Sequence, residues 1–573
     1  MRQALLRQLT LLNLYSRGWL VMRNKYVHGQ QPIIRKPRSR FDLSAHHKTT
    51  LNVGQLVPFY LQEIYPGDTF KVDTTFVARV TSSFLKPVID NLFLDMYYFF
   101  VPNRLTFSDW ALVMGENKSS YWARTNPVSV PTATVSTVTS GSIADYMGLP
   151  VGTLSVAKQV NALPFRAFAL VYNEWFRNQN TTAPVNVPIS ASQPAVNGNA
   201  WSVNNYMGMP PYASKLHDYF TSCLPAPQKG GATPINIGGL APVYPQEGLT
   251  VEDFDLTESP SALTWYSPAG GMSPTTGYNL IGLADVSANY LTTYRGSQST
   301  GTSALGTSVY PNNLIADLGA ATGSYNVNDL RFAFQLQKML EKDARGGTRY
   351  SEYLLEHFGV NAGDARLQRP EFLAGSRSPI NVQQVAQTSQ SSDGSPLANV
   401  AAYSLSNGTS RFSKSFVEHG FVIGVCVLRY YHTYQQGIER FWRRSNRTDY
   451  YDPVFAHIGE QPVYTDELYA PTVSSIIFGY NEAWADLRYK PSRISGDLRS
   501  AASEGLDVWH FGDYYSTAPY LTSAWMQEQP SYVDRTLSVS SSVVDQYILD
   551  IYSKVDAVRA LPTYSVPSLI DHN

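Results

Sequence analysis

The sequence has very little cysteine and few charged residues. Cys223 and Cys426 are the only cysteines among 573 residues, and neither has a second cysteine nearby. A disulfide framework and a cysteine-based zinc or iron–sulfur site are therefore excluded. Charged residues make up 16% of the chain and hydrophobic residues 43%, which is opposite to the composition of disordered chains. We expect a folded chain that is stabilised by burial rather than by disulfide bonds.

Long apolar runs and the short motifs of common enzymes are also missing. The longest uncharged apolar run, Phe421–Leu428, is far shorter than the roughly 18 to 20 residues of a membrane-spanning helix. The sequence contains no Walker phosphate loop, no glycine-rich dinucleotide fingerprint, no His-Glu-x-x-His zinc helix and no Gly-x-Ser-x-Gly elbow. The pair His46-His47 has no third ligand at a recognisable spacing. We expect no enzymatic activity, no cofactor and no membrane span, and the sequence leaves open whether a divalent ion binds.

Tyrosine, in contrast, is abundant. The chain holds 38 Tyr, 25 Phe and 10 Trp, so that 13% of its residues are aromatic. A tyrosine combines a large apolar ring with a hydroxyl that needs a partner, and tyrosines are enriched at protein interfaces. The composition favours a chain with extensive protein contacts.

Positive charge is concentrated near the N-terminus. Residues 1–48 hold ten Lys and Arg against the single acid Asp42, a net charge of +9, so the remaining residues carry −10. Arg35–Arg40 contains a proline and lacks apolar periodicity, which predicts an extended arm that binds a polyanion. A solvated, disordered terminus is the alternative. The basic residues assigned to nucleic-acid binding in this arm are Arg35, Lys36, Arg38, Arg40 and Lys48. Residues 1–21, with leucines near helical spacing, are predicted to be a dispensable extension before Met22.

Beyond the arm the sequence predicts strands near both ends of the chain. Alternating apolar and polar residues indicate a half-buried strand over Lys71–Val80. The run Leu92–Val101 is apolar on both faces and indicates a strand buried between two layers. Further strands are predicted over Phe416–Tyr434, Asp507–Phe511 and Leu537–Tyr552.

Helices and one long loop are predicted as insertions into this β core. Helical patterns cover Asn328–Lys342 and a segment that starts at Thr348 and stops at Gly359. The stretch Thr181–Tyr325 has only three basic and eight acidic residues, 11 charges in 145 residues, and is rich in Pro, Gly, Ser, Thr and Asn. A loop of this length is typically a binding excursion. We interpret it as an ordered insertion that projects from the core.

A second basic cluster alternates with aromatic residues. Its arginines and rings are Arg429, Arg440, Arg443, Arg444 and Arg447 with Tyr430, Tyr431, Tyr434, Phe441 and Trp442. This pattern suits a single-stranded nucleic acid, whose phosphates would contact the arginines while unpaired bases stack on the rings. Salt bridges between subunits are an equal alternative. A third cluster, Arg488, Lys490, Arg493 and Arg499, lies among acids and is interpreted as structural.

Several segments spread along the chain carry more specific motifs. They are Arg38–Ser44, Gly67–Asp73, Leu94–Arg104, Ile458–Gln461, Gly479–Arg493, Leu506–His510 and the ending Ser568–His572. Together they resemble the major capsid protein of gokushoviruses, which are small single-stranded DNA bacteriophages of the microvirus family. The resemblance covers nearly everything from about Met22 onward. Residues 1–21 and Thr181–Tyr325 follow no motif of the family.

The resemblance implies a mainly β fold, an eight-stranded antiparallel jelly roll with long loop and helical insertions. About sixty copies would close a T=1 icosahedral shell around circular single-stranded DNA, assembled in the cytoplasm of the bacterial host. It also implies as partners a minor capsid or pilot protein, a small basic DNA-binding protein, an internal scaffolding protein and a host receptor. The rival interpretation is a secreted or tail-associated carbohydrate-active β protein.

These interpretations divide the chain into four parts. Residues 1–48 form the basic arm, 49–180 the first part of the jelly roll, 181–325 a variable surface protrusion and 326–573 the rest of the core. The host-binding surface is predicted at the tip of the protrusion, within Gly230–Thr302. The aromatic candidates for host attachment there are Phe254, Trp265, Tyr266 and Tyr278.

Overall fold

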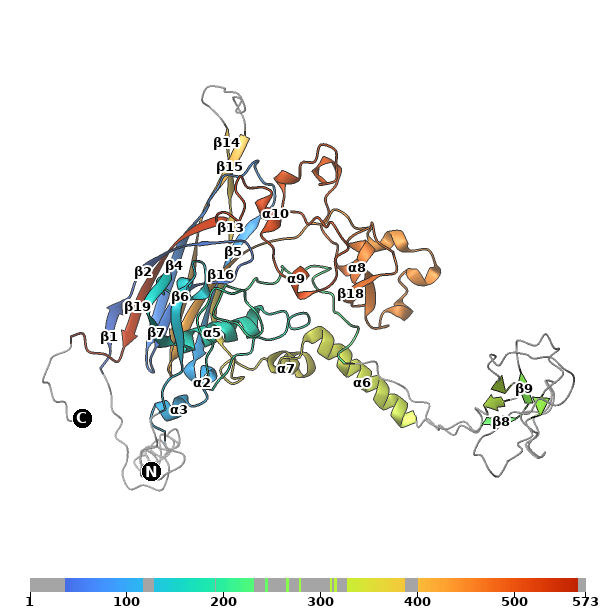
Figure 1. Cartoon of the computed structure of the whole chain (residues 1–573), viewed down its shortest axis with the longest axis horizontal. Coiled ribbons are helices and arrows are strands. Elements are labelled where there is room, and N and C mark those ends of the chain that lie inside the picture. The colour runs from blue at the N-terminus through green and yellow to red at the C-terminus, as the bar shows by residue number, and fades with distance from the viewer. Residues whose placement is uncertain are drawn as a thin grey trace, which may run out of the picture. The chain divides into compact units, whose positions relative to one another are not determined.

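A computed structural model describes most of the chain (Figure 1). The described residues are 37–116, 128–190, 192–230, 327–386 and 400–564, with short strands at 243–245, 264–266, 278–279, 310–311 and 314–316. The chain divides into two compact units, one made of Met1–Pro227 with Arg349–Asn573 and the other of Gln228–Thr348. None of the described helices is both long enough and apolar enough to cross a membrane.

Two antiparallel sheets form the core of the first unit. The first contains β1 (Ser39–Asp42) and β2 (Ala45–Leu51) along one edge of β19 (Tyr547–Arg559), followed by β4 (Thr69–Val80), β15 (Val400–Ser415) and β14 (Val382–Ala386). The second has the order β13 (Glu371–Ile380), β5 (Leu92–Pro102), β16 (Gly420–Tyr430) and β3 (Val57–Ile64). Except for β14 and β15, strands that are neighbours in a sheet are far apart in the sequence, and the chain passes repeatedly from one sheet to the other. This is the arrangement of a jelly roll. The predicted mainly β class is confirmed, whereas among the described residues the two sheets have six and four strands rather than the eight in total that were predicted.

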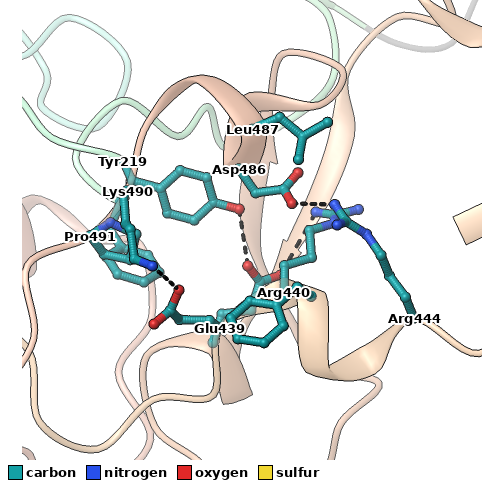
Figure 2. A pocket seen from close by; sticks show the side chains of 11 residues that line it. Tyr219, Glu439, Arg440, Arg444, Asp486, Leu487, Lys490 and Pro491 are labelled. Carbon is teal, nitrogen blue, oxygen red and sulfur yellow. Dashed lines mark hydrogen bonds and ion pairs between the residues drawn. The ribbon is translucent and has the colours of Figure 1, made fainter. Parts of the chain in front are cut away.

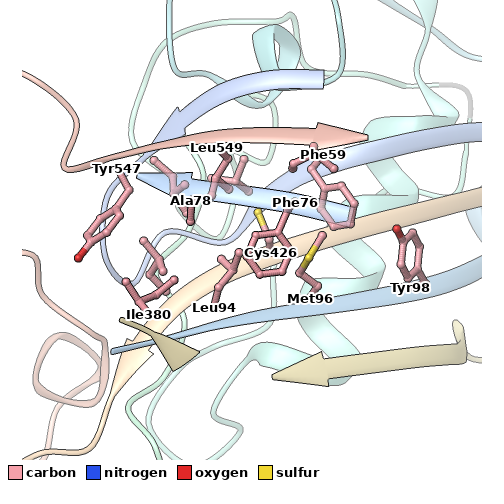
Figure 3. Close-up of a cluster of buried hydrophobic side chains, with 14 of the residues drawn as sticks. Phe59, Phe76, Ala78, Leu94, Met96, Tyr98, Ile380, Cys426, Tyr547 and Leu549 are labelled. Carbon is pink, nitrogen blue, oxygen red and sulfur yellow. The ribbon is translucent and has the colours of Figure 1, made fainter. Parts of the chain in front are cut away.

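The two sheets face each other across a shared hydrophobic core. Phe76 and Leu549 of the first sheet are buried together with Leu94, Met96 and Cys426 of the second (Figure 3). In β4 the burial alternates residue by residue, as the sequence pattern predicted. Burying one such aromatic or aliphatic side chain contributes roughly 1.5 to 3 kcal/mol, so this interface supplies much of the driving force for folding.

The second sheet is covered on its outer face as well. Phe99 of β5 and Ile423 of β16 pack with Phe168 of α5 (Leu163–Val171) in a second hydrophobic cluster. This double cover explains why β5 and β16 are apolar on both faces. The first sheet has no such cover over β19, β4 and β15 among the described residues, since outward-facing Thr75, Tyr552 and their neighbours are exposed.

Smaller elements complete each of the two units. In the first unit they are α2 (Asn103–Thr106), α3 (Trp110–Val113), β6 (Thr132–Val138), α4 (Ile143–Tyr146), β7 (Gly152–Asn161), α7 (Tyr350–Phe358), β17 (Gln461–Tyr464), β18 (Ile477–Asn481), α8 (Ala485–Arg488), α9 (Ser523–Met526) and α10 (Ser531–Asp534). In the second unit they are β8 (Val243–Pro245), β9 (Thr264–Tyr266), β10 (Tyr278–Asn279), β11 (Tyr310–Pro311), β12 (Leu314–Ala316) and α6 (Val327–Gly346). Both predicted helices are confirmed, and α7 ends at Gly359 in the left-handed conformation with φ of 68°.

Two strand predictions were wrong. Asp507–Phe511 contains a short 3-10 turn over Asp507–Trp509 rather than a strand. The backbone N–H of Phe511 donates to the carboxylate of Asp90, 2.7 Å away, instead of to a neighbouring strand. The C-terminal strand starts only at Tyr547 and not at Leu537, because serine-rich turns occupy the residues before it.

Candidate nucleic-acid interface

The basic arm enters the first sheet through β1 and β2. Arg35 and Lys36 lie outside the described residues, and Arg38 is exposed. Arg40 in β1 pairs with Asp556 at 2.6 Å, and Lys48 in β2 pairs with Asp550 at 3.0 Å. A hydrogen bond from Lys48 lowers the pKa of Asp550. Both pairs are exposed, so water and salt screen them strongly. These cations therefore stay accessible to a polyanion.

The arginines that follow β16 are arranged differently. We call residues 440–447 the arginine loop. Arg443 contacts Asp466 at 2.7 Å and lies 3.8 Å above the ring of Tyr464. Arg440 donates to the carbonyl of Pro462 at 2.7 Å and lies 3.7 Å from the buried carboxylate of Glu467. Each of these side chains is at most one quarter exposed, which makes the pairs part of the local structure.

A small pocket of about 130 Å³ opens beside this loop. In Figure 2 Arg444 points at Asp486 and Lys490 points at Glu439. Burial by itself would lower the pKa of Arg440, but Glu467, Tyr219 and Asp486 together outweigh burial and raise it. The pocket is lined by cations whose carboxylate partners come from the same chain. It therefore offers little free positive charge to a phosphate.

Arg447 is the exception within the arginine loop. Its side chain is exposed and, among the described residues, has no hydrogen-bond or ion-pair partner. The rings nearest in sequence are also exposed, Phe441 by 45%, Trp442 by 73% and Tyr450 by 57%. Of the four predicted arginines in this loop, only Arg447 is both accessible and unpaired in the part of the chain that the structure describes.

The remaining predicted basic residues are mostly paired. Arg429 donates to the fully buried Asp95 of β5 at 2.7 Å, which also receives Arg377 at 2.7 Å. In the third cluster Lys490 and Arg493 both pair with Glu439, at 3.3 and 3.0 Å. The structural interpretation of that cluster agrees with these contacts.

The structure contains a buried charge network that was not predicted from the sequence. His432 lies between two carboxylates, with Nδ1 2.7 Å from Asp513 and Nε2 3.0 Å from Glu528, and Asp513 also receives Lys215 at 3.0 Å. All four side chains are at most 3% exposed. Burial alone would lower the pKa of His432, but the two carboxylates outweigh it and raise the pKa to about 9. No spacing rule connects positions so far apart in the chain, so no sequence signal was available.

The solvent-facing side of β2, β19, β4 and β15 also carries charge that the sequence analysis did not use. We call this surface the open sheet face. Its exposed cations without an ion pair, among the described residues, are Lys71, Arg79, Arg411 and Lys554. Lys71 and Arg79 were visible as polar members of the alternating pattern in β4. Their role could be recognised only once the structure showed that none of the described residues forms a layer over that side.

The host-attachment candidates fall in the second unit. Phe254 lies outside the described residues. Trp265 and Tyr266 belong to β9, and Trp265 is directly opposite Tyr278 of β10 in the backbone register. The fold thus brings three of the four candidates onto adjacent strands of one small sheet.

Comparison with known proteins gives a consistent result over nearly the whole length. The model of the family described as capsid protein (F protein) matches residues 30–569. Capsid protein VP1 of Spiroplasma virus 4 is 40% identical over 93% of this chain and 95% of its own. Capsid protein VP1 of Chlamydia phage 1 is 36% identical over 96% of this chain and 98% of its own. Capsid protein VP1 of Bdellovibrio phage phiMH2K is 36% identical over 95% of this chain and 98% of its own.

Proposed function

The chain belongs to the capsid protein (F protein) family, and from this premise we propose that about sixty copies enclose a circular single-stranded DNA genome with the basic arm turned inward. Membership makes the chain a structural protein of the virion that assembles into a shell. We also propose that the chain has no enzymatic activity.

Exposed apolar side chains support the assembly of many copies. Val417 is 86% exposed, Val454 84% and Trp442 73%. Exposure of large apolar groups to water is unfavourable. When a neighbouring subunit covers them, the free energy of burial favours association by roughly 25 cal/mol per Å² of apolar surface. Tyr and Trp at such contacts carry much of the binding energy in protein interfaces. The high tyrosine content of the chain fits this use.

The single observation that carries the genome contact is the junction between the arm and the first sheet. Arg40 and Lys48 lie in strands on the edge of that sheet and remain exposed despite their ion pairs. The residues before them add further positive charge without matching acids. Each phosphate that these cations neutralise releases counterions, so binding is expected to depend on salt and not on base sequence.

The insertion is proposed to face outward and to contact the host. Trp265, Tyr266 and Tyr278, with Phe254, supply aromatic groups for a trimer contact or for a receptor, and the polar residues between them suit a glycan or a surface protein. A minor capsid or pilot protein, a small basic DNA-binding protein and an internal scaffolding protein are proposed as further partners.

Replacing basic residues of the arm tests the genome contact. Arg38, Arg40 and Lys48 are changed to Gln, and the DNA content of purified particles is measured by absorbance and density. We expect shells that contain less DNA and lose it at lower salt. A matched control changes Lys490 and Arg493, which share the partner Glu439, and should package normally. Unchanged DNA content in the arm variant would contradict the proposal.

A further inference from the structure

The open sheet face contains a shallow groove of about 400 Å³. Its walls include His46, Thr75, Val77, Asn407, Asp550 and Tyr552. The pairing register places these residues in two adjacent rows that cross the sheet. One row runs from His46 through Tyr552 to Thr75, and the next from Lys48 through Asp550 to Val77. The groove therefore lies across the strands at the middle of the sheet.

An aromatic platform forms one end of this groove. The rings of His46 and Tyr552 lie 4.6 Å apart at an interplanar angle of 34°. Both are exposed, His46 by 64% and Tyr552 by 36%. Aromatic side chains on the open face of a sheet are a recurrent platform on which unpaired bases stack. The groove thus presents a ring surface to solvent.

Polar groups without partners lie beside the platform. The amide of Asn407 and the hydroxyls of Thr75 and Thr409 are exposed, and none of them has a side-chain hydrogen bond among the described residues. An amide supplies donors and an acceptor in one plane and matches the edge of a base. The floor of the groove can therefore hydrogen-bond a stacked base without breaking any contact within the protein.

Cations that have no ion pair in the described part of the chain lie on both sides of the groove. Arg79 is two residues beyond Val77 on β4, and Lys554 is two residues beyond Tyr552 on β19, with Arg411 on β15 at the same end. Across the open sheet face five cations, Lys48 and the four without an ion pair, oppose three carboxylates, a net charge of 5 − 3 = +2. The basic arm joins this same sheet. The charge is complementary to a phosphate chain that passes over the strands.

We propose that this groove binds an unpaired nucleotide of the packaged single-stranded DNA. The base stacks on Tyr552 and His46 and contacts Asn407, while the neighbouring phosphates approach Arg79 and Arg411. The inference rests on the proposed function and deepens it, because it assigns a defined site on the folded domain to a contact otherwise attributed to the arm. Occupation by a second copy of the chain is the competing outcome.

Photochemical cross-linking of intact particles tests the stacking contact. Particles are irradiated at a wavelength absorbed by bases, and nucleotide adducts on peptides are identified by mass spectrometry. We expect adducts on the peptides that contain Tyr552 and His46. Tyr552→Phe keeps the ring and should retain the adduct on the β2 peptide, whereas Tyr552→Leu should lower its yield about tenfold. Adducts on the arm but none on either sheet peptide would overturn the inference and leave the proposed function intact. Adducts nowhere on the chain would overturn both.

A second measurement tests the cations independently of the rings. DNA release from particles carrying Arg79→Gln and Arg411→Gln is followed with a dye as salt is raised. We expect the logarithmic salt dependence to fall by about 0.7 for each lost phosphate contact. Lys490→Gln with Arg493→Gln is the control and should leave the dependence unchanged. An unchanged dependence in the Arg79 and Arg411 variant, or lysine cross-links that join Lys554 to another copy of the chain, would overturn the inference.

Discussion

The arginine loop and the open sheet face both combine arginines with aromatic rings, yet their charges have different roles. Arg440, Arg443 and Arg444 are largely buried beside carboxylates of their own chain. Arg79 and Arg411 on the sheet face outward and have no ion pair in the described part of the molecule. The first arrangement stabilises a loop, and the second leaves charge available to a ligand. Local density of arginine therefore predicts structure or binding only after its carboxylate partners are known.

Among the changes considered, Asp486→Asn is expected to lower the stability of the chain the most. The change removes the carboxylate from Arg444, whose side chain is only 12% exposed, and leaves a mostly buried charge unpaired. We expect a loss of about 3 to 5 kcal/mol in the free energy of unfolding, measured from urea denaturation of the full chain. Arg79→Gln should change it by less than about 0.5 kcal/mol. Equal losses in the free energy of unfolding for the two variants would contradict the difference between the arginine loop and the open sheet face.

The fully buried charge of His432 should contribute a smaller, pH-dependent part of the free energy of unfolding. The pKa of His432 is raised from 6.5 to about 9, so the folded chain holds this proton more tightly than the unfolded chain. The stabilisation is complete below pH 6.5 and is lost as the pH rises through 9, on the order of 3 kcal/mol. Urea midpoints at pH 6.5 and 9.5 check this prediction. His432→Gln should remove this dependence and His46→Gln should not, whereas retention of the dependence in His432→Gln would contradict it.

Within the arginine loop, replacing Arg447 and replacing Arg440 should have different effects on the salt dependence of DNA release. Arg447→Gln is expected to lower the logarithmic salt dependence of DNA release by about 0.7, because one phosphate contact is lost. Arg440→Gln should lower the free energy of unfolding. It should leave the salt dependence unchanged, because the charge of Arg440 is already paired with Glu467. Particles prepared from both variants can be compared in the same dye-release measurement. A larger change in salt dependence for Arg440→Gln would reverse our assignment.

The smallest effect is expected from removing residues 1–21. Their predicted helix is shorter than the about 12 to 15 residues that a helix needs for stability in water. A chain starting at Met22 should therefore form particles with the same yield and DNA content. Sedimentation and absorbance of purified particles measure both. Failure to assemble would show that charge availability is not the only use of the N-terminal arm.

The sequence predicted those parts of the fold that depend on local periodicity. Alternation in β4, the apolar run of β5 and the helix ending at Gly359 are all local patterns, and the structure contains each element. Asp507–Phe511 was misread, because the carboxylate of Asp90, distant in sequence, accepts the backbone N–H that a strand would have used. Charge partners escaped prediction for the same reason. His432 meets Asp513 only through the fold, and so does Arg444 with Asp486.

The position of β19 has a consequence for the order of events during synthesis. This strand lies between β4 and the pair formed by β1 and β2, although β4 ends at Val80 and β19 begins only at Tyr547. At a translation rate of about 5 to 20 residues per second, roughly 20 to 90 s separate the synthesis of β4 from that of its neighbour β19. Chains released early lack the strand that holds β1 and β2. The first sheet can therefore be completed only after β19 has been synthesised.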